Sequence, residues 1–184
     1  MIRLTVIFLS LVTIVSCAKH NKACKKAAQD FDDIFKSLNG DTRNTMDTEV
    51  HEYTFSLSSD KEVCEIGYQS QRRLREIPYK IEIEEVNTGI VIYSEEFEFS
   101  ANRTSYVIPS QTINLSANTS YQLRRVQTNW LGNIANTIGK IKRDVVFPLQ
   151  SGDLTILSSN FYDEGDTTVN DIGFLPYIDI VFKP

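Results

Sequence analysis

The segment Tyr79-Lys80-Ile81-Glu82-Ile83-Glu84 alternates apolar and charged residues at every step. Successive side chains of a β-strand point to opposite faces, so this period of two predicts a strand with one face in the core and one in water. Asn87-Thr88-Gly89 follows, with a glycine where a turn needs a positive φ, and apolar residues return from Ile90. Together the two halves predict an antiparallel hairpin, because parallel strands are usually buried on both faces.

Further short segments share the strand composition or the period of two of this hairpin. They cover residues 53–57, 63–68, 104–108, 112–115, 121–126, 154–157 and 177–182. About eight to ten short strands joined by Gly, Asn, Ser and Pro turns predict an all-β fold, an antiparallel β-sandwich of immunoglobulin-like or jelly-roll type. A closed barrel is the alternative shape. Residues 41–49 are expected to be a polar linker and residues 128–143 a loop-rich segment.

The N-terminus has the pattern of a bacterial lipoprotein signal. Arg3 supplies a positive charge and residues 4–15 are almost wholly apolar. The motif Ile14-Val15-Ser16-Cys17 resembles the lipobox at which such proteins are acylated and cleaved. The apolar run is shorter than the about 20 residues that a permanent membrane helix needs. We therefore expect residues 1–16 to be a signal peptide and Cys17 to be the lipidated N-terminus, with a plain secretory signal or a buried N-terminal strand ending in Cys17 as the alternatives.

Residues 17–49 are expected to form the lipidated cysteine, a tether and a short helix, ahead of a sandwich domain at residues 50–184. Within residues 18–41, apolar residues recur at helical spacing. They are Phe31, Ile34, Phe35 and Leu38. Two alternatives remain open for this apolar face: it docks on the sandwich, or it stays near the membrane.

The three cysteines of the chain allow one disulfide. If Cys17 carries lipid, Cys24 and Cys64 remain as a candidate pair in an oxidising envelope compartment. Closing a loop of this length would contribute about 4 kcal/mol in the chain-entropy model. The alternative is a buried, reduced Cys64 and an exposed Cys24 thiol, and the sequence leaves both open. The spacing contains no CxxC pair, so a zinc site built from these cysteines is not predicted.

The composition argues against several functional classes. The formal net charge is −5 at pH 7, whereas a nucleic-acid-binding surface needs an excess of basic residues. Neither His20 nor His51 belongs to a metal or triad motif, and His51 is expected at a strand edge. The glutamates alternate with apolar residues, which indicates a solvated sheet face rather than paired catalytic acids. We therefore expect a protein that is not an enzyme, with a carboxylate-dependent hydrolase as the least favoured alternative.

An acidic loop near the C-terminus is the candidate metal site. Its candidate calcium ligands are Asp163, Glu164, Asp166 and Asp171. Hard cations take about six to eight oxygen ligands from such clusters, although the order of residues here does not match the EF-hand loop. Calcium is therefore the one candidate cofactor, and no other is expected.

Aromatic and polar residues near the predicted loops form a candidate glycan site. Flat aromatic rings can stack on the C–H surfaces of sugars, while Arg and Asn side chains can bind hydroxyl groups. The candidate residues are Trp130, Asn129, Asn133, Arg124 and Tyr162. Core packing is the competing explanation for aromatic residues in this region, Tyr68 and Phe161 included.

Four segments carry a resemblance to a group of known proteins. They are Gly67–Ser70, Gln127–Asn133, Thr155–Tyr162 and Leu175–Phe182. Over about residues 50–184 the chain resembles small uncharacterised β-sandwich lipoproteins of Bacteroidota. These lipoproteins are similar to a sandwich domain of unknown function attached to bacterial carbohydrate-active proteins. The resemblance implies an envelope location, a sandwich fold and, by analogy, glycan binding.

These observations predict an outer-membrane lipoprotein in the cell envelope of a Gram-negative bacterium. Lys19 and Lys22 follow Cys17 where surface-exported lipoproteins of that group carry an acidic run, so the domain is expected to face the periplasm. The expected function is that of a non-catalytic binding module for glycan or cell-wall material. The expected partners are the membrane, through the lipid anchor, and such a glycan, with no nucleic acid. The alternative function is a protein-interaction subunit of an envelope complex.

Overall fold

The computed structural model describes residue 24 and residues 29–39, 42–45, 48–70, 76–129, 139–163 and 173–184. Within these ranges the chain forms one helix and thirteen strands. They are α1 (Asp30–Ser37), β1 (Arg43–Thr45), β2 (Val50–Leu57), β3 (Lys61–Tyr68), β4 (Tyr79–Glu85), β5 (Ile90–Phe97), β6 (Ser105–Val107), β7 (Asn114–Leu115), β8 (Ser120–Gln127), β9 (Gly139–Lys142), β10 (Leu149–Ser151), β11 (Leu154–Tyr162), β12 (Leu175–Pro176) and β13 (Asp179–Phe182).

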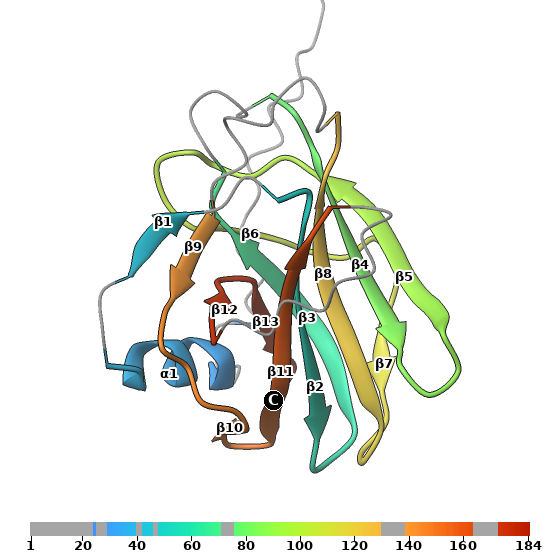
Figure 1. The fold of residues 1–184 in the computed structure, drawn as a ribbon. Helices are drawn as coiled ribbons and strands as arrows, with labels where there is room; N and C mark the ends of the chain where they lie inside the picture. The colour runs from blue at the N-terminus through green and yellow to red at the C-terminus, as the bar shows by residue number, and fades with distance from the viewer. Residues whose placement is uncertain are drawn as a thin grey trace, which may run out of the picture.

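The strands pair antiparallel throughout and form an all-β sandwich, as predicted. The larger sheet has the strand order β10-β11-β2-β8-β4-β5, and its long strands lie side by side in Figure 1. A second sheet has the order β13-β3-β6, with β7 also paired to β3, and a small third sheet has the order β1-β9-β12. Helix α1 lies against β10 and β13 beside the small third sheet.

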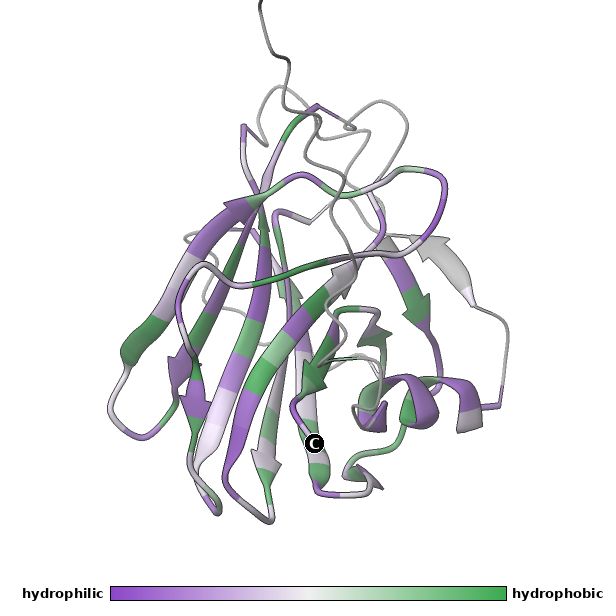
Figure 2. Ribbon diagram, turned by 180° about the vertical axis from the view of Figure 1, so that it is seen from behind, coloured by the Kyte–Doolittle hydropathy of each residue, from purple (hydrophilic) through white to green (hydrophobic). Residues whose placement is uncertain are grey.

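The core fills the space between the sheets and follows the predicted alternation. Tyr79, Ile81 and Ile83 of β4 are at most 1 % exposed, while Lys80 and Glu82 between them face the other way. Ile178, Ile180 and Phe182, which the sequence places on one face, are all fully buried. Figure 2 shows this pattern as hydrophilic and hydrophobic colours that alternate along the long strands.

Helix α1 docks on the sandwich, which decides between the two alternatives for its apolar face. Phe31 stacks on Tyr53 of β2 with ring centres 5.2 Å apart, and Phe35 meets Tyr177 edge-on at 4.8 Å. Phe31, Ile34 and Phe35 are at most 5 % exposed. Such aromatic contacts add about 0.5–1.5 kcal/mol each beyond burial. No helix among the described residues is long and apolar enough to cross a membrane.

Four short strands, β1, β9, β10 and β12, lie where the sequence predicts none. Strand β1 falls in the predicted linker 41–49 and pairs with β9, which falls in the predicted loop 128–143. Both strands are short and neither shows a period of two, so only their long-range pairing identifies them. Strand β11 also extends beyond the predicted residues 154–157 to Tyr162.

Cys24 and Cys64 form a disulfide, with Cα atoms 6.0 Å apart. The bridge packs with Val181 of β13 and Tyr106 of β6 in a small cluster separate from the main core. It therefore ties residue 24 to β3, on the side of the second sheet that faces away from the sandwich interior.

Gly152, in the turn between β10 and β11, fixes the position of helix α1. Its φ is +51°, and a Cβ at this position would lie 2.4 Å from the Asp30 carboxylate at the start of the helix. Asp30 is only 7 % exposed, so its side chain has little room to retreat. The turn and the helix can approach this closely only because residue 152 has no side chain.

Gly152→Ala should therefore destabilise the protein more than Gly89→Ala in the β4–β5 turn. Gly89 also has a positive φ, of +67°, but a Cβ there would meet nothing within 4 Å. Both variants introduce about 1–2 kcal/mol of backbone strain, and only Gly152→Ala adds a clash with Asp30. Urea unfolding should show an extra loss of about 1 kcal/mol or more for Gly152→Ala. Equal losses in the two variants would contradict this account.

A buried carboxyl group lies on the outer side of the second sheet. Asp179 of β13 pairs with Gly67 of β3, which in turn pairs with Tyr106 of β6. The Tyr106 ring covers Gly67, where a Cβ would come within 2.5 Å of it, and its hydroxyl donates a 2.8 Å hydrogen bond to Asp179. Burial raises the pKa of Asp179 to about 6, although the Tyr106 hydrogen bond opposes the shift.

Asp179→Asn should stabilise the protein at pH 8 and much less at pH 4. The pKa of Asp179 is about 6 when folded and 3.8 in the reference state, so between these values the folded chain binds a proton that the unfolded chain does not. Stability therefore falls as pH rises through this window, by about 1–3 kcal/mol. Denaturant unfolding at both pH values measures the effect, with the exposed Glu98→Gln as the control. A gain that is independent of pH would refute the assignment.

Candidate functional site

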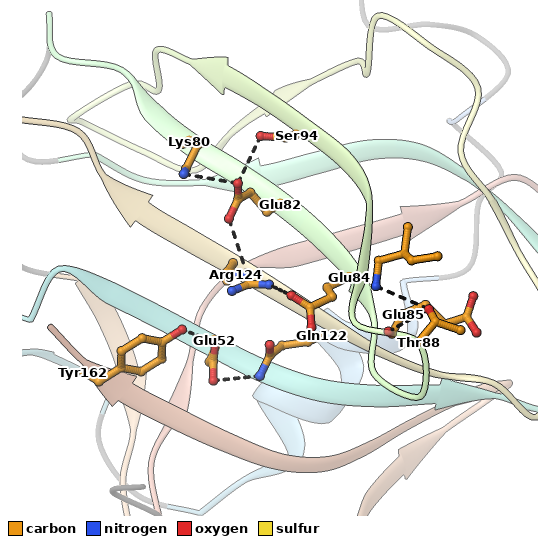
Figure 3. Close-up of polar contacts among 11 residues, drawn as sticks. Glu52, Lys80, Glu82, Glu84, Glu85, Thr88, Ser94, Gln122, Arg124 and Tyr162 are labelled. Carbon is orange, nitrogen blue, oxygen red and sulfur yellow. Dashed lines mark hydrogen bonds and ion pairs between the residues drawn. The ribbon is translucent and has the colours of Figure 1, made fainter. Parts of the chain in front are cut away.

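The outer face of the larger sheet carries a continuous row of polar side chains. Glu52 of β2 lies opposite Arg124 of β8, Arg124 lies opposite Glu82 of β4, and Glu82 lies opposite Ser94 of β5. Each belongs to the positions that alternate with core residues, so the register that builds the core also builds this row. Figure 3 shows these side chains converging above the sheet.

Arg124 links two glutamates across this face. Its Nε lies 3.5 Å from a Glu82 oxygen, and its Nη2 donates a hydrogen bond to Glu84. Glu82 is further held by Lys80, at 3.2 Å, and by a 3.1 Å hydrogen bond from the Ser94 hydroxyl. Since these side chains are only partly exposed, the ion pairs are screened less than ordinary surface pairs. They form a fixed frame beside Glu52.

Glu52 is the most buried member of the face, at 4 % exposure. Its carboxylate accepts a 3.0 Å hydrogen bond from the Tyr162 hydroxyl and a 2.8 Å bond from the Gln122 amide. Burial raises the pKa of Glu52, and the Tyr162 bond and the Arg124 charge oppose the shift. Burial together with the Glu52 charge raises the pKa of Tyr162 to about 12, so its hydroxyl remains a donor at neutral pH.

A hollow of about 220 Å³ lies beside Glu52. It is lined by Glu52, Tyr53, Thr54, Gln122, Ser158, Ser159 and Asn160. The register between β11 and β2 shifts between Ile156 and Ser158, and such a bulge re-aims the side chains that follow it. The lining offers carboxylate, amide and hydroxyl groups. Its volume is smaller than that of a typical pocket for a drug-sized ligand, so it suits one unit of a longer polar molecule.

Two residues of the candidate glycan site are brought together on this face. Arg124 and Tyr162 come from different strands and meet at Glu52, since Tyr162 bonds Glu52 and Arg124 lies opposite it in register. Asn129 lies two residues beyond β8 with a φ of 54°. Trp130 and Asn133 lie outside the described residues. The hollow adds Glu52, Gln122 and Asn160, which are not among the predicted site residues although each faces outward on its strand.

The candidate calcium loop is described only in part. Asp163 accepts a 3.1 Å hydrogen bond from the backbone amide of Glu49, just before β2 begins. Glu164, Asp166 and Asp171 lie outside the described residues. Among the residues that the structure describes, no group of three or more His, Cys, Asp or Glu side chains is arranged to hold a metal ion. Calcium at this loop therefore stays a prediction.

The prediction that His51 lies at a strand edge is wrong. His51 lies in β2, which is paired on both sides, and it is fully buried against Phe161 with ring centres 4.8 Å apart. Burial and the nearby Arg125 charge keep its pKa well below 6.5, so the ring is neutral. Phe161 and Tyr68, considered as loop aromatics, are at most 2 % exposed and pack in the interior. The packing explanation is correct for both.

Comparison with known proteins adds no family assignment, since no family model matches the chain and no similar curated protein is found. The resemblance to Bacteroidota lipoproteins therefore stays a prediction. Any function proposed for this chain therefore rests on the polar face itself.

Proposed function

We propose that this chain is a non-catalytic binding module that holds a hydroxyl-rich ligand, a glycan or cell-wall fragment, on the outer face of the larger sheet. The observation that carries the proposal is the hollow beside Glu52, lined by carboxylate, amide and hydroxyl groups. Sugar hydroxyls both donate and accept hydrogen bonds, and these groups offer partners of both kinds. The hollow is open on a sheet face, so it can take one ring of an extended chain.

The fixed frame around the hollow supports binding. Arg124 and its glutamate partners hold the neighbouring side chains in place, and Tyr162 and Gln122 orient the Glu52 carboxylate. A preorganised site loses less side-chain entropy when a ligand binds. The ionised carboxylate has about four acceptor positions, of which Tyr162, Gln122 and Asn160 use three. Glu52 is thus the group with acceptor capacity left for a ligand hydroxyl.

The same contacts favour binding over catalysis. A glycosidase needs two carboxyl groups free to act as acid and as nucleophile or base. Glu82 and Glu84 are both held by Arg124, and Glu52 is held by Tyr162. Acids committed to such bonds are positioned to stabilise the sheet face. A carboxylate-dependent hydrolase remains the least favoured alternative.

Binding should be lost when the Glu52 carboxylate is removed. Glu52→Gln is expected to weaken the binding of a responsive glycan by about tenfold or more, because a hydrogen bond to a charged group contributes about 1.5–3 kcal/mol. An array of cell-wall and envelope glycans identifies the ligand, and calorimetry then measures its affinity for wild type and variant. Glu98→Gln, an exposed glutamate away from the hollow, is the matched control.

Two outcomes would contradict this placement. If no glycan on the array binds the wild type, glycan binding is excluded for the panel, and the alternative becomes the better proposal. If Trp130→Ala abolishes binding and Glu52→Gln leaves it unchanged, the ligand does not occupy the hollow.

The alternative is a protein-interaction subunit of an envelope complex. It is favoured by the exposed apolar tip of the β4–β5 hairpin, where Val86, Ile90 and Val91 are 44–58 % exposed. Strand β5 is also the last strand of the larger sheet, and edge strands can pair with a partner chain.

We propose that the module is anchored at Cys17 in the outer membrane and faces the periplasm. The disulfide between Cys24 and Cys64 supports an oxidising compartment, because such bonds are rare in the cytosol. Lys19 and Lys22 beside the anchor would lie near anionic head groups, where each lysine contributes about 1 kcal/mol.

Mass spectrometry of the protein purified from membranes should find an acylated cysteine at residue 17 as the N-terminus. Several acyl chains hold a protein on a membrane because each buried methylene contributes about 0.8 kcal/mol. Cys17→Ser should release the protein from the membrane fraction. An unmodified residue 17 in the wild type would exclude the anchor.

A further inference from the structure

Polar side chains replace apolar ones at one end of the sandwich interior. Along β8 the inward row runs from Leu123 to Arg125 and Gln127, and along β2 it reaches His51. Arg125 and His51 are fully buried and Gln127 is 1 % exposed. Arginine is seldom fully buried without an acidic partner, so this end of the core needs an explanation.

These side chains form one cluster that spans both sheets. His51 lies directly opposite Arg125, and Gln127 lies opposite Tyr79. The Arg125 guanidinium is 5.3 Å from the centre of the Tyr79 ring and 5.7 Å from that of Tyr68, which belongs to the second sheet. We call these five residues the Arg125 cluster.

The hydrogen-bonding capacity of the Arg125 cluster is largely unused. Arg125 Nη1 donates to the backbone carbonyl of Glu49 at 3.2 Å. Within the described part of the chain, five buried atoms of the cluster have no partner: Arg125 Nε and Nη2, His51 Nδ1 and Nε2, and Gln127 Oε1. Each buried group left in this way is expected to meet a water or an ion.

The free groups of Arg125 match an anion. Nε and Nη2 are neighbours on one side of the planar guanidinium, and their parallel N–H bonds are the pair that grips a carboxylate. No ion pair of Arg125 with a described residue is present. The two tyrosine rings stabilise the cation through cation–π contacts, but they offer no anionic acceptor.

The rest of the cluster suits the same ligand. The Tyr68 hydroxyl can donate a hydrogen bond, and burial, partly offset by Arg125, raises its pKa, so the hydroxyl keeps its proton. His51 is neutral and carries one N–H that can donate. A water would satisfy hydrogen bonds without balancing the positive charge, and an unbalanced buried charge is strongly destabilising.

We propose that the Arg125 cluster binds a small anion, either a halide or a small carboxylate, between the two sheets. Arg125 Nε and Nη2 hold the anion side-on, and the Tyr68 hydroxyl and the His51 N–H are the supporting donors. The side chains of the cluster are almost fully buried, so we expect the ligand to be small. This site lies on the inward face of β8, so it is independent of the hollow on the outward face.

The test measures the melting temperature of the mature protein, purified from cells after processing, at constant ionic strength. Chloride, bromide or formate replaces gluconate, which is too large for the interior. We expect a saturable rise in melting temperature with the anion that fits, and no rise in Arg125→Met. Arg103→Met, which removes an exposed arginine, is the matched control and should respond like the wild type. The halide and formate arms distinguish the two kinds of anion.

Crystals of the wild type soaked in bromide provide a readout that needs no variant. An anomalous peak within hydrogen-bonding distance of Arg125 Nε and Nη2 supports the proposal. If Arg125→Met fails to fold, the crystals alone test the proposal. A bromide peak at Arg125 then identifies the ligand as a halide, and formate bound at Arg125 in a crystal soaked in formate identifies it as a small carboxylate. Only water at Arg125 in both crystals, or an equal anion response in Arg125→Met and wild type, overturns it.

Discussion

The structure depends on the uninterrupted pairing of β8 with β2 on one side and β4 on the other. Seven consecutive residues pair along each interface, and β8 is in register with both neighbours throughout. Because side chains alternate between faces, a slip of one residue would turn every inward side chain of β8 outward. Arg124 would then enter the core and Leu123 would face water. This single register places the apolar core, the polar outer face and the buried Arg125 cluster.

Two adjacent arginines on β8 are stabilised by different partners on the two faces of the sheet. Arg124 faces outward and is balanced by the carboxylates of Glu82 and Glu84. Arg125 faces inward and rests between the rings of Tyr68 and Tyr79. The outer face supplies charge and the inner face supplies polarisable surface. Neighbouring residues of one type therefore have different chemistry, which the register alone decides.

Much of the fold could be predicted from the sequence, because alternation is a local signal. The hairpin around Gly89, the buried face of β4 and the shared face of Ile178 and Ile180 are visible in single segments. Strands β1 and β9 could not be predicted, since three or four residues carry no period and their pairing joins segments about a hundred residues apart. Only part of the candidate site could be predicted from the sequence. Alternation shows that Glu52 and Gln122 face outward, but only the strand order shows that they meet Arg124.

The disulfide has a mechanical consequence for an anchored molecule. If Cys17 is held in a bilayer, a force on the anchor passes along the chain to Cys24, seven residues later. The disulfide then transmits this force to Cys64 of β3. A fully extended chain of that length reaches about 25 Å. Helix α1 and β1 then carry no tension, although they follow Cys24 in the sequence. A pull on Cys17 would therefore be transmitted first to the pairing of β3 with its neighbours in the second sheet.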